Sequence, residues 1–309
     1  MADMSDTLSA IRTRMGRAEV AILLVLGLLW GGSYFFVEIL LQSLPPFSII
    51  AVRLTLASAV LWGLVAVTRT PVPRHAGGWA TLATVGLIGV AVPFMLIVWG
   101  QTRITGGLAA ILNATAPLFT VVIAGLFLTD ERITLAKFGG VAIGLLGVGV
   151  LVGPSAILNA NGSALGQAAV ILAALCYSVA GIVSRRFSRI GISPLMVATG
   201  QCSLAAILMV PLAIATDGLA PLAAAPCDAW LALLALALLS TVLAYILYFR
   251  LIDRAGATNA VLVAYLIPVS AIALGAMFLG ERLTPMQLAG GALIGVGLLV
   301  TDGRIFSRA

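Results

Sequence analysis

The fold is decided by residues 105–140, which read TGGLAAILNATAPLFTVVIAGLFLTDERITLAKFGG. A second version stands at residues 256–291, GATNAVLVAYLIPVSAIALGAMFLGERLTPMQLAGG. Each copy has an apolar run with a central proline (Pro117 or Pro268), then a Glu-Arg pair, and then another apolar run that ends in glycines. Self-similarity of this length is the signature of a duplicated structural unit. The sequence therefore predicts two copies of one unit.

The amino-acid composition indicates whether these two units are surrounded by water or by lipid. The chain has 309 residues, of which 61% are hydrophobic and 9% are charged. Soluble domains carry about 25% charged residues. A helix that spans a bilayer needs about 20 mostly apolar residues, and such runs follow one another along this chain. Transmembrane strands would alternate apolar and polar residues, and these runs are continuous. The sequence therefore predicts an all-α polytopic membrane protein.

Ten apolar runs are long enough to be transmembrane helices. We expect them at residues 19–41, 47–67, 79–99, 106–128, 134–152, 164–184, 194–215, 229–251, 258–279 and 284–301. The first run is too long for the apolar region of a signal peptide, about 7–15 residues, and should remain as a helix.

Arginines concentrate in the tails and in alternate loops, so the positive-inside rule places both termini in the cytoplasm. These arginines also account for the net charge of +6, which therefore does not indicate nucleic-acid binding.

The repeat unit contains five helices. Trp79 and Trp230 start the third and eighth runs, and Pro46 and Pro194 open the second and seventh. Because five is odd, the second copy enters the membrane from the opposite side. Transporters that alternate access around a site near the midplane are typically built in this way. We expect a cytoplasmic tail (1–18), a first repeat (19–152), an external linker (153–163), an inverted second repeat (164–301) and a second cytoplasmic tail (302–309).

Three motifs resemble the drug/metabolite transporter superfamily, in particular its ten-helix EamA-type members: WGGSYF at residues 30–35, the proline followed by Glu-Arg and threonine, and its second copy with GERLT at 280–284. The resemblance covers essentially the whole chain. It implies two five-helix halves around a central cavity, in a secondary carrier of the bacterial inner (plasma) membrane. Many members export amino acids or other small metabolites, and one branch exports aromatic amino acids. The expected partners are a small-molecule substrate and the lipid bilayer, with the chain a monomer or homodimer and with no cofactor or metal.

Glu38 and Arg53 are charged residues well inside apolar runs. Ionisable groups within the membrane are costly and indicate a functional site or a buried pair. Both residues fall in the predicted outer leaflet, so they either pair across the hairpin or contact the substrate. The repeat counterpart of Arg53 is the neutral Gln201, so the duplicated architecture does not require the pair. We therefore favour a role for both residues in cavity polarity or coupling.

Polar and aromatic residues in the middle of apolar runs are candidates for substrate binding. A polar group that faces lipid costs on the order of several kcal/mol, so these side chains should face the bundle interior. Interfacial anchoring or contacts between helices are the alternatives. The candidates are Trp30, Tyr34, Trp99, Asn113, Tyr177, Tyr245 and Tyr265.

The Glu-Arg pairs and prolines that both copies of the repeat share each have a structural as well as a functional interpretation. The pairs Glu131-Arg132 and Glu281-Arg282 are either gates or turn residues. Thr284, Pro285 and Gln287 have the pattern of a helix start with a capping box, which favours turns. Pro117 and Pro268 are hinges or static kinks.

Two small-residue patterns in the fifth and tenth runs should allow close helix packing, within the scaffold or in a dimer. They are Gly140/Gly144 and Gly291/Gly295.

We expect a secondary transporter that exports small metabolites, with aromatic or apolar amino acids as the preferred substrates. The alternatives within transport are a proton-coupled multidrug exporter, with Glu38 as the proton site, and a carrier of nucleotide-sugar or lipid-like metabolites. A membrane-embedded enzyme is disfavoured because His75 is the sole histidine and lies in a loop, and the three cysteines lack metal-ligand spacing.

Overall fold

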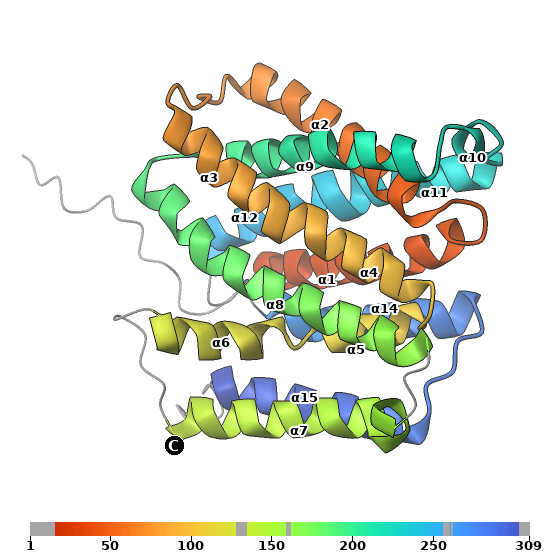
Figure 1. Cartoon of the computed structure of the whole chain (residues 1–309). Coiled ribbons are helices and arrows are strands. Elements are labelled where there is room, and N and C mark those ends of the chain that lie inside the picture. The colour runs from red at the N-terminus through yellow and green to blue at the C-terminus, as the bar shows by residue number, and fades with distance from the viewer. Residues whose placement is uncertain (1–15, 128–134, 159–161, 256–259, 261, 303–309) are drawn as a thin grey trace, which may run out of the picture.

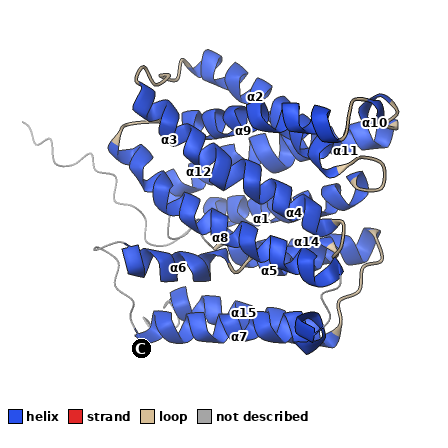
Figure 2. Ribbon diagram, in the orientation of Figure 1, coloured by secondary structure: helices blue, strands red, loops and turns tan. Residues whose placement is uncertain are grey.

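The computed structural model describes residues 16–127, 135–158, 162–255, 260 and 262–302. Helices and connecting loops make up this part of the chain, and it contains no strand (Figure 2). Seven helical stretches are long and apolar enough to cross a membrane, and shorter apolar helices occur at Lys137–Val150, Val263–Phe278 and Pro285–Val300. Each of the ten predicted spans corresponds to one of these stretches. The prediction of an all-α membrane protein is confirmed.

The helices of the two halves follow the same order. The first half comprises α1 (Arg17–Leu40), α2 (Pro46–Thr68), α3 (Ala76–Gly86), η1 (Leu87–Ala91), α4 (Val92–Gln101), α5 (Gly106–Asn113), α6 (Ala116–Phe127) and α7 (Leu135–Leu158). The second half comprises α8 (Gly162–Arg189), α9 (Pro194–Thr216), the short α10 (Ala220–Ala223), α11 (Cys227–Ala237), η2 (Leu238–Leu243), α12 (Ala244–Ala255), α14 (Val263–Phe278) and α15 (Pro285–Asp302). Figure 1 shows them as one layered bundle.

Contacts between the halves are repeated when the halves are exchanged. Helix α2 packs on its counterpart α9, and α7 packs on its counterpart α15. Helix α1 packs on α14, and its counterpart α8 packs on α6 in the same way. The pairing of α4 with α8 likewise has its equivalent in the pairing of α12 with α1. This exchange symmetry is what two copies of one unit produce.

Equivalent helices run antiparallel. Ser48 near the start of α2 donates from its backbone N to Asp217 Oδ2 at the end of α9 (2.8 Å). Farther along, Trp62 Nε1 of α2 donates to Ser203 Oγ of α9 (2.9 Å). A helix and its repeat counterpart that pass in opposite directions belong to units that are inverted relative to each other. The inverted repeat is therefore visible in the packing as well as in the loop charges.

Glycines hold α7 and α15 close together, on one side of the bundle (Figure 1). A Cβ added at Gly297 would lie 2.5 Å from the Gly144 backbone nitrogen, and one at Gly147 would lie 2.7 Å from that of Ile294. The predicted small-residue packing of α7 is therefore confirmed, within one chain. On α15 the contact uses Gly297, whereas Gly291 faces Ile111 of α5.

The third helix of each half contains a π-helical turn at the same place. These turns are η1 and η2, and η1 directly precedes the helical segment that contains Pro93. The sequence analysis predicted no π-helical turn. Turns of this type are rare and are often found at functional sites.

Helix starts and prolines are placed largely as expected. Pro46 and Pro194 occupy first-turn positions of α2 and α9. Helix α5 ends at Asn113 and α6 begins at Ala116, so a helix break directly precedes Pro117. Helix α14 continues through Pro268, so the break considered there does not occur within Val263–Phe278.

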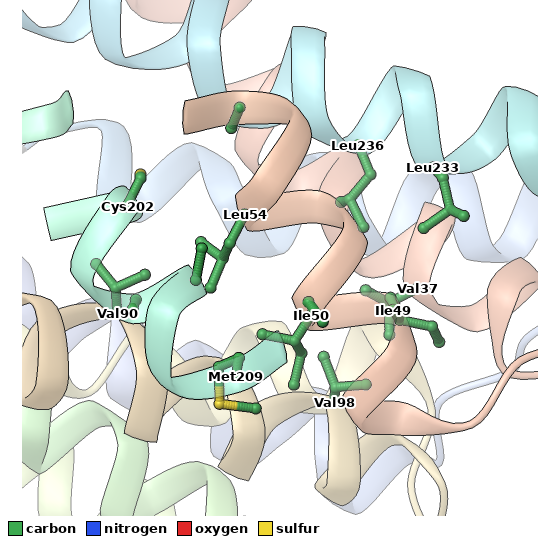
Figure 3. Packing of buried hydrophobic residues seen from close by; sticks show 14 of the residues in the cluster. Val37, Ile49, Ile50, Leu54, Val90, Val98, Cys202, Met209, Leu233 and Leu236 are labelled. Atoms are coloured by element: carbon green, nitrogen blue, oxygen red, sulfur yellow. The ribbon is translucent and has the colours of Figure 1, made fainter. Parts of the chain in front are cut away.

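The largest apolar core lies among α1, α2, η1, α4, α9 and α11. Figure 3 shows its side chains interdigitating around Leu54 and Ile50 of α2. Cys202 is fully buried there, as expected of a cysteine that serves packing. The labelled members are Val37, Ile49, Ile50, Leu54, Val90, Val98, Cys202, Met209, Leu233 and Leu236. This core fixes α2 in the bundle and so positions Arg53, which stands one residue before Leu54.

Candidate functional site

Arg53 is a buried cation at the centre of the contacts between the halves. Its side chain is 7% exposed. The Nε atom donates to Thr241 Oγ1 of η2 (2.9 Å), and the Cζ atom lies 4.1 Å from the ring centroid of Phe94 of α4. A guanidinium over an aromatic face gains a cation–π interaction. Thr241 and Phe94 are contacts that the sequence analysis missed.

Four further polar side chains surround Arg53 within electrostatic range. They are the hydroxyls of Tyr34, Tyr177 and Tyr245 and the thiol of Cys202. They come from α1, α8, α12 and α9, so both halves contribute. The structure thus gathers three of the predicted tyrosines around the predicted arginine.

Asn113 joins this group at the end of α5. Its side chain interacts with the Tyr34 hydroxyl. Its Oδ1 atom is buried and has no hydrogen-bond partner in the described part of the chain. Tyr34 therefore interacts with an asparagine that has an unused acceptor, and it also lies within electrostatic range of Arg53.

Glu38 belongs to a different cluster, one turn further along α1 from Tyr34. The Nε2 atom of Gln101 donates to Glu38 Oε2 (3.3 Å) and to the backbone oxygen of Tyr34 (3.0 Å). Glu38 and Arg53 therefore do not form the ion pair that the sequence left open. Each has its own partner, Gln101 in one case and Thr241 in the other.

Glu281 caps the start of α5 from the other half of the molecule. The backbone N–H groups of Gly106 and Gly107 donate to its Oε1 and Oε2 atoms (3.3 and 3.2 Å). A carboxylate at a helix N-terminus is stabilised by the unpaired amides and the helix dipole. A Cβ at Gly275 would lie 2.5 Å from Glu281 Oε2, so that glycine leaves room for the carboxylate. Glu38 lies near this carboxylate and beside the Gly106 amide.

The Glu-Arg motif is therefore more than a turn. The predicted capping box is confirmed, because Gln287 N donates to Thr284 Oγ1 (3.2 Å) and Thr284 N donates to Gln287 Oε1 (2.8 Å). The contact of Glu281 with α5 was not predicted. Its repeat counterpart, the Glu131-Arg132 pair, lies outside the described residues.

Two predicted aromatic residues pack on side chains outside the group around Arg53. Trp30 packs on Tyr248, with ring centroids 5.2 Å apart. Trp99 lies under the guanidinium of Arg103, at 3.7 Å from Cζ to the ring centroid, where α4 ends. The stacking on Arg103 suits the interfacial alternative for Trp99.

Tyr265 lines a mostly apolar cavity of about 270 Å³ between α5, α14 and α15, together with Pro268. Ile111 and Ala114 of α5 lie on the opposite wall.

A second cavity, of about 330 Å³, lies between α2, α9 and α12. Thr70, Ser193 and Arg250 line it, which places it at the end of the bundle predicted to be cytoplasmic. Tyr245 also lines it and lies within range of Arg53. This cavity therefore leads from that end of the bundle towards the Arg53 cluster, whereas Glu281 caps α5 at the opposite end.

Comparisons with known proteins agree with this architecture. The chain is 28% identical to the uncharacterized inner membrane transporter YedA of Escherichia coli (strain K12), over 91% of this chain and 90% of that protein. It is 26% identical to a probable amino-acid metabolite efflux pump of the same organism, over 93% and 95% of the two chains. It is 27% identical to a probable terminal-alkyne amino-acid exporter of Streptantibioticus cattleyicolor, over 83% and 84%.

A protein of known crystal structure has the same fold, with a TM-score of 0.66 and 22% identity over 94% of this chain and 99% of the other. Two segments of the chain, residues 17–153 and residues 164–301, each match the sequence model of the EamA-like transporter family. Each range covers most of one structural half, and the chain therefore belongs to the EamA-like transporter family of membrane transporters.

Proposed function

We propose that the protein is a secondary transporter that exports small metabolites from the bacterial cytoplasm, with amino acids that carry aromatic or apolar side chains as the preferred substrates. The observation that carries this proposal is the buried Arg53 among tyrosine hydroxyls contributed by both halves. An arginine in an apolar bundle favours an anionic group such as a carboxylate, and the surrounding rings favour an apolar side chain. The names of the relatives in Escherichia coli and Streptantibioticus cattleyicolor support the same substrate class.

We propose alternating access as the mechanism, and the contribution of both halves to the group around Arg53 supports it. A rocking motion of one half against the other changes which end of the bundle communicates with a site at their interface. The cavity at Tyr245 opens towards the predicted cytoplasmic end, and the Glu281 cap ties the halves together at the other. We interpret this arrangement as the state that receives substrate from the cytoplasm.

The proposed setting is the bacterial inner membrane, with both termini in the cytoplasm. The proposed repeats span residues 19–152 and 164–301, joined by an external linker at 153–163. We propose no catalytic role, because the relatives are named as transporters and a carrier of this kind needs only binding and a conformational change.

Uptake and exchange in proteoliposomes test the substrate class. The purified protein is reconstituted and loaded in turn with each common amino acid, and counterflow of the radiolabelled compound is measured with and without an imposed proton gradient. The proposal expects exchange of aromatic or large apolar amino acids. Exchange of a nucleotide sugar or a lipid, with no amino acid moved, would overturn the substrate assignment and leave the transporter fold intact.

Proton-coupled export of drugs or other metabolites is the second candidate. A carboxylate inside the bundle has to bind and release a proton in such a carrier. Glu38 is partly buried within α1 and lies near a second carboxylate, Glu281. If Glu38→Gln abolished gradient-driven transport and lipophilic cations competed with substrate, this candidate would replace the first.

A further inference from the structure

Arg53 has hydrogen-bonding capacity that the protein does not use. A guanidinium carries five N–H donors, and the structure shows one protein acceptor for them, Thr241 Oγ1. The charged form is buried at 7% exposure, and no carboxylate of the described chain pairs with it. A buried cation without a counter-ion is unfavourable, so the site as it stands favours an anion that brings its own oxygen acceptors.

Asn113 has an unused hydrogen-bond acceptor, whereas Arg53 has unused donors. Its Oδ1 atom is a buried acceptor without a donor from the described residues. A buried acceptor that lacks a hydrogen bond is costly. An ammonium group has three donors and no acceptor, so it matches an orphan carbonyl oxygen. The Asn113 amide therefore favours a cationic donor, opposite in sign to the group that Arg53 favours.

Both groups act on the same side chain. Tyr34 interacts with the Asn113 amide and lies within electrostatic range of Arg53. An α-amino acid carries a carboxylate and an ammonium group on adjacent atoms of one carbon centre. A ligand of that kind carries both missing partners, an anionic group for Arg53 and a cationic donor for Asn113.

Resting on the transport function proposed above, we propose that Arg53 and Asn113 form a zwitterion site beside Tyr34. Arg53 binds the substrate carboxylate with paired N–H donors. Asn113 Oδ1 accepts a hydrogen bond from the substrate ammonium group. The rings of Phe94 and Tyr245 supply apolar surface for the substrate side chain, and Tyr245 also borders the cavity at the predicted cytoplasmic end.

Glu38 is a less suitable partner for the ammonium group. Its carboxylate accepts from Gln101 Nε2 (3.3 Å) and lies at the amides that begin α5. It is also not among the groups that surround Arg53. The site proposed here therefore favours a substrate with both charges over compounds that carry one alone.

Three probes that share a phenyl ring and the two carbons next to it separate these contributions. They are L-phenylalanine, 3-phenylpropanoate, which lacks the amine, and 2-phenylethylamine, which lacks the carboxylate. Counterflow of radiolabelled phenylalanine in proteoliposomes is measured with each unlabelled probe as competitor. For wild-type protein we expect both analogues to compete at least about tenfold more weakly than phenylalanine, the effect of one charge-assisted contact.

Two variants should then change selectivity in opposite directions. Arg53→Gln should remove the preference for phenylalanine over phenylethylamine and keep the preference over phenylpropanoate. Asn113→Leu, which is close to isosteric, should do the reverse. The matched control is Gln167→Leu, another buried amide whose Oε1 lacks a partner. It stands ten residues, about 15 Å along α8, from Tyr177 and should leave both preferences unchanged.

Each result decides between the claims. If phenylalanine is exchanged but either analogue competes equally in wild-type protein, the zwitterion site is refuted and the transport function stands. The zwitterion site would also be refuted if each variant weakened competition by all three probes to the same extent. If another amino acid is the one exchanged, its deaminated and decarboxylated forms replace these analogues. If no amino acid is exchanged, the proposed function fails and this inference fails with it. A variant that does not fold, judged by size-exclusion chromatography, leaves the wild-type competition to decide.

Discussion

At the scale of single residues, the buried arginine is held by one hydroxyl and one ring. Thr241 sits in a π-helical turn, and its Oγ1 atom both accepts from Arg53 (2.9 Å) and donates to the backbone oxygen of Leu236 (3.1 Å). The extra residue in that turn therefore directs the hydroxyl towards α2. Sequence analysis could identify Arg53, because a charge in an apolar run stands out. It could not identify Thr241, because the two residues are separated by 188 positions.

Thr241→Val tests this contact, since the two side chains have nearly the same shape. We expect a loss of stability of about 1.5–3 kcal/mol, the contribution of a hydrogen bond to a charged group, measured by urea or thermal unfolding in detergent. Thr55→Val is the control, because the Thr55 hydroxyl bonds to the backbone of its own helix at Ala51 (2.8 Å). Equal effects of the two substitutions would contradict the assignment.

At the scale of helices, α5 in the first half is capped by Glu281 of the second half. The amides of Gly106 and Gly107 bond to Glu281 across a separation of about 175 residues in sequence. Local pattern predicts the Thr284 capping box, because all its members lie within one helical turn. The Glu281 contact depends on tertiary placement, and the signal in the sequence is indirect. Gly275 stands six residues before Glu281, and Gly125 stands six residues before Glu131.

Glu281→Gln should weaken the cap on α5. It keeps the side-chain shape and removes the charge, so we expect a loss of about 0.3–1 kcal/mol, and up to about 2 in this partly buried setting. Thermal unfolding of the purified protein measures it. Arg282→Gln, at the exposed neighbouring position, should be close to neutral. The assignment would be wrong if the arginine substitution were the more damaging of the two.

The glycine contact between α7 and α15 makes a separate prediction. Gly297→Ala places a Cβ 2.5 Å from the Gly144 nitrogen and 2.6 Å from the Gly140 oxygen. Because backbone atoms cannot yield as a flexible side chain does, we expect a loss of about 1–3 kcal/mol. Gly295→Ala on the same helix meets no atom within 4 Å and should be neutral or slightly stabilising. Equal stability of the two variants in thermal unfolding would argue against close packing here.

At the scale of the whole molecule, hydropathy and the repeat predict the spans and their inversion. This succeeds because bilayer thickness fixes helix length and an odd number of helices fixes the relative orientation of the halves. The arrangement of the site is less predictable. Three tyrosines, Asn113 and Arg53 were identified as candidates from their depth in apolar runs. Trp30, Trp99 and Tyr265 met the same criterion, but their described surroundings are Tyr248, Arg103 and the cavity between α5, α14 and α15. The position of a residue along a helix does not specify whether its side chain points to the interior of the bundle.

Cysteine labelling tests the inverted topology. Single cysteines at Arg103 and Arg254, in a background without Cys176, Cys202 and Cys227, should react with a membrane-impermeant reagent from opposite sides. The two positions are repeat counterparts, and inversion places one outside and the other inside. Labelling of both from the same side would refute the inversion.

The most direct measurement of the central claim is counterflow of radiolabelled phenylalanine in proteoliposomes that contain wild-type, Arg53→Gln or Arg103→Gln protein. Arg103 is the matched arginine, since it stacks on Trp99 at the end of α4, away from the cluster. We expect exchange by wild-type and Arg103→Gln protein at similar rates, and a decrease of at least about tenfold for Arg53→Gln, in line with the loss of a charge-assisted contact to the carboxylate. Exchange that is unaffected by Arg53→Gln would contradict a central amino-acid site built around this arginine.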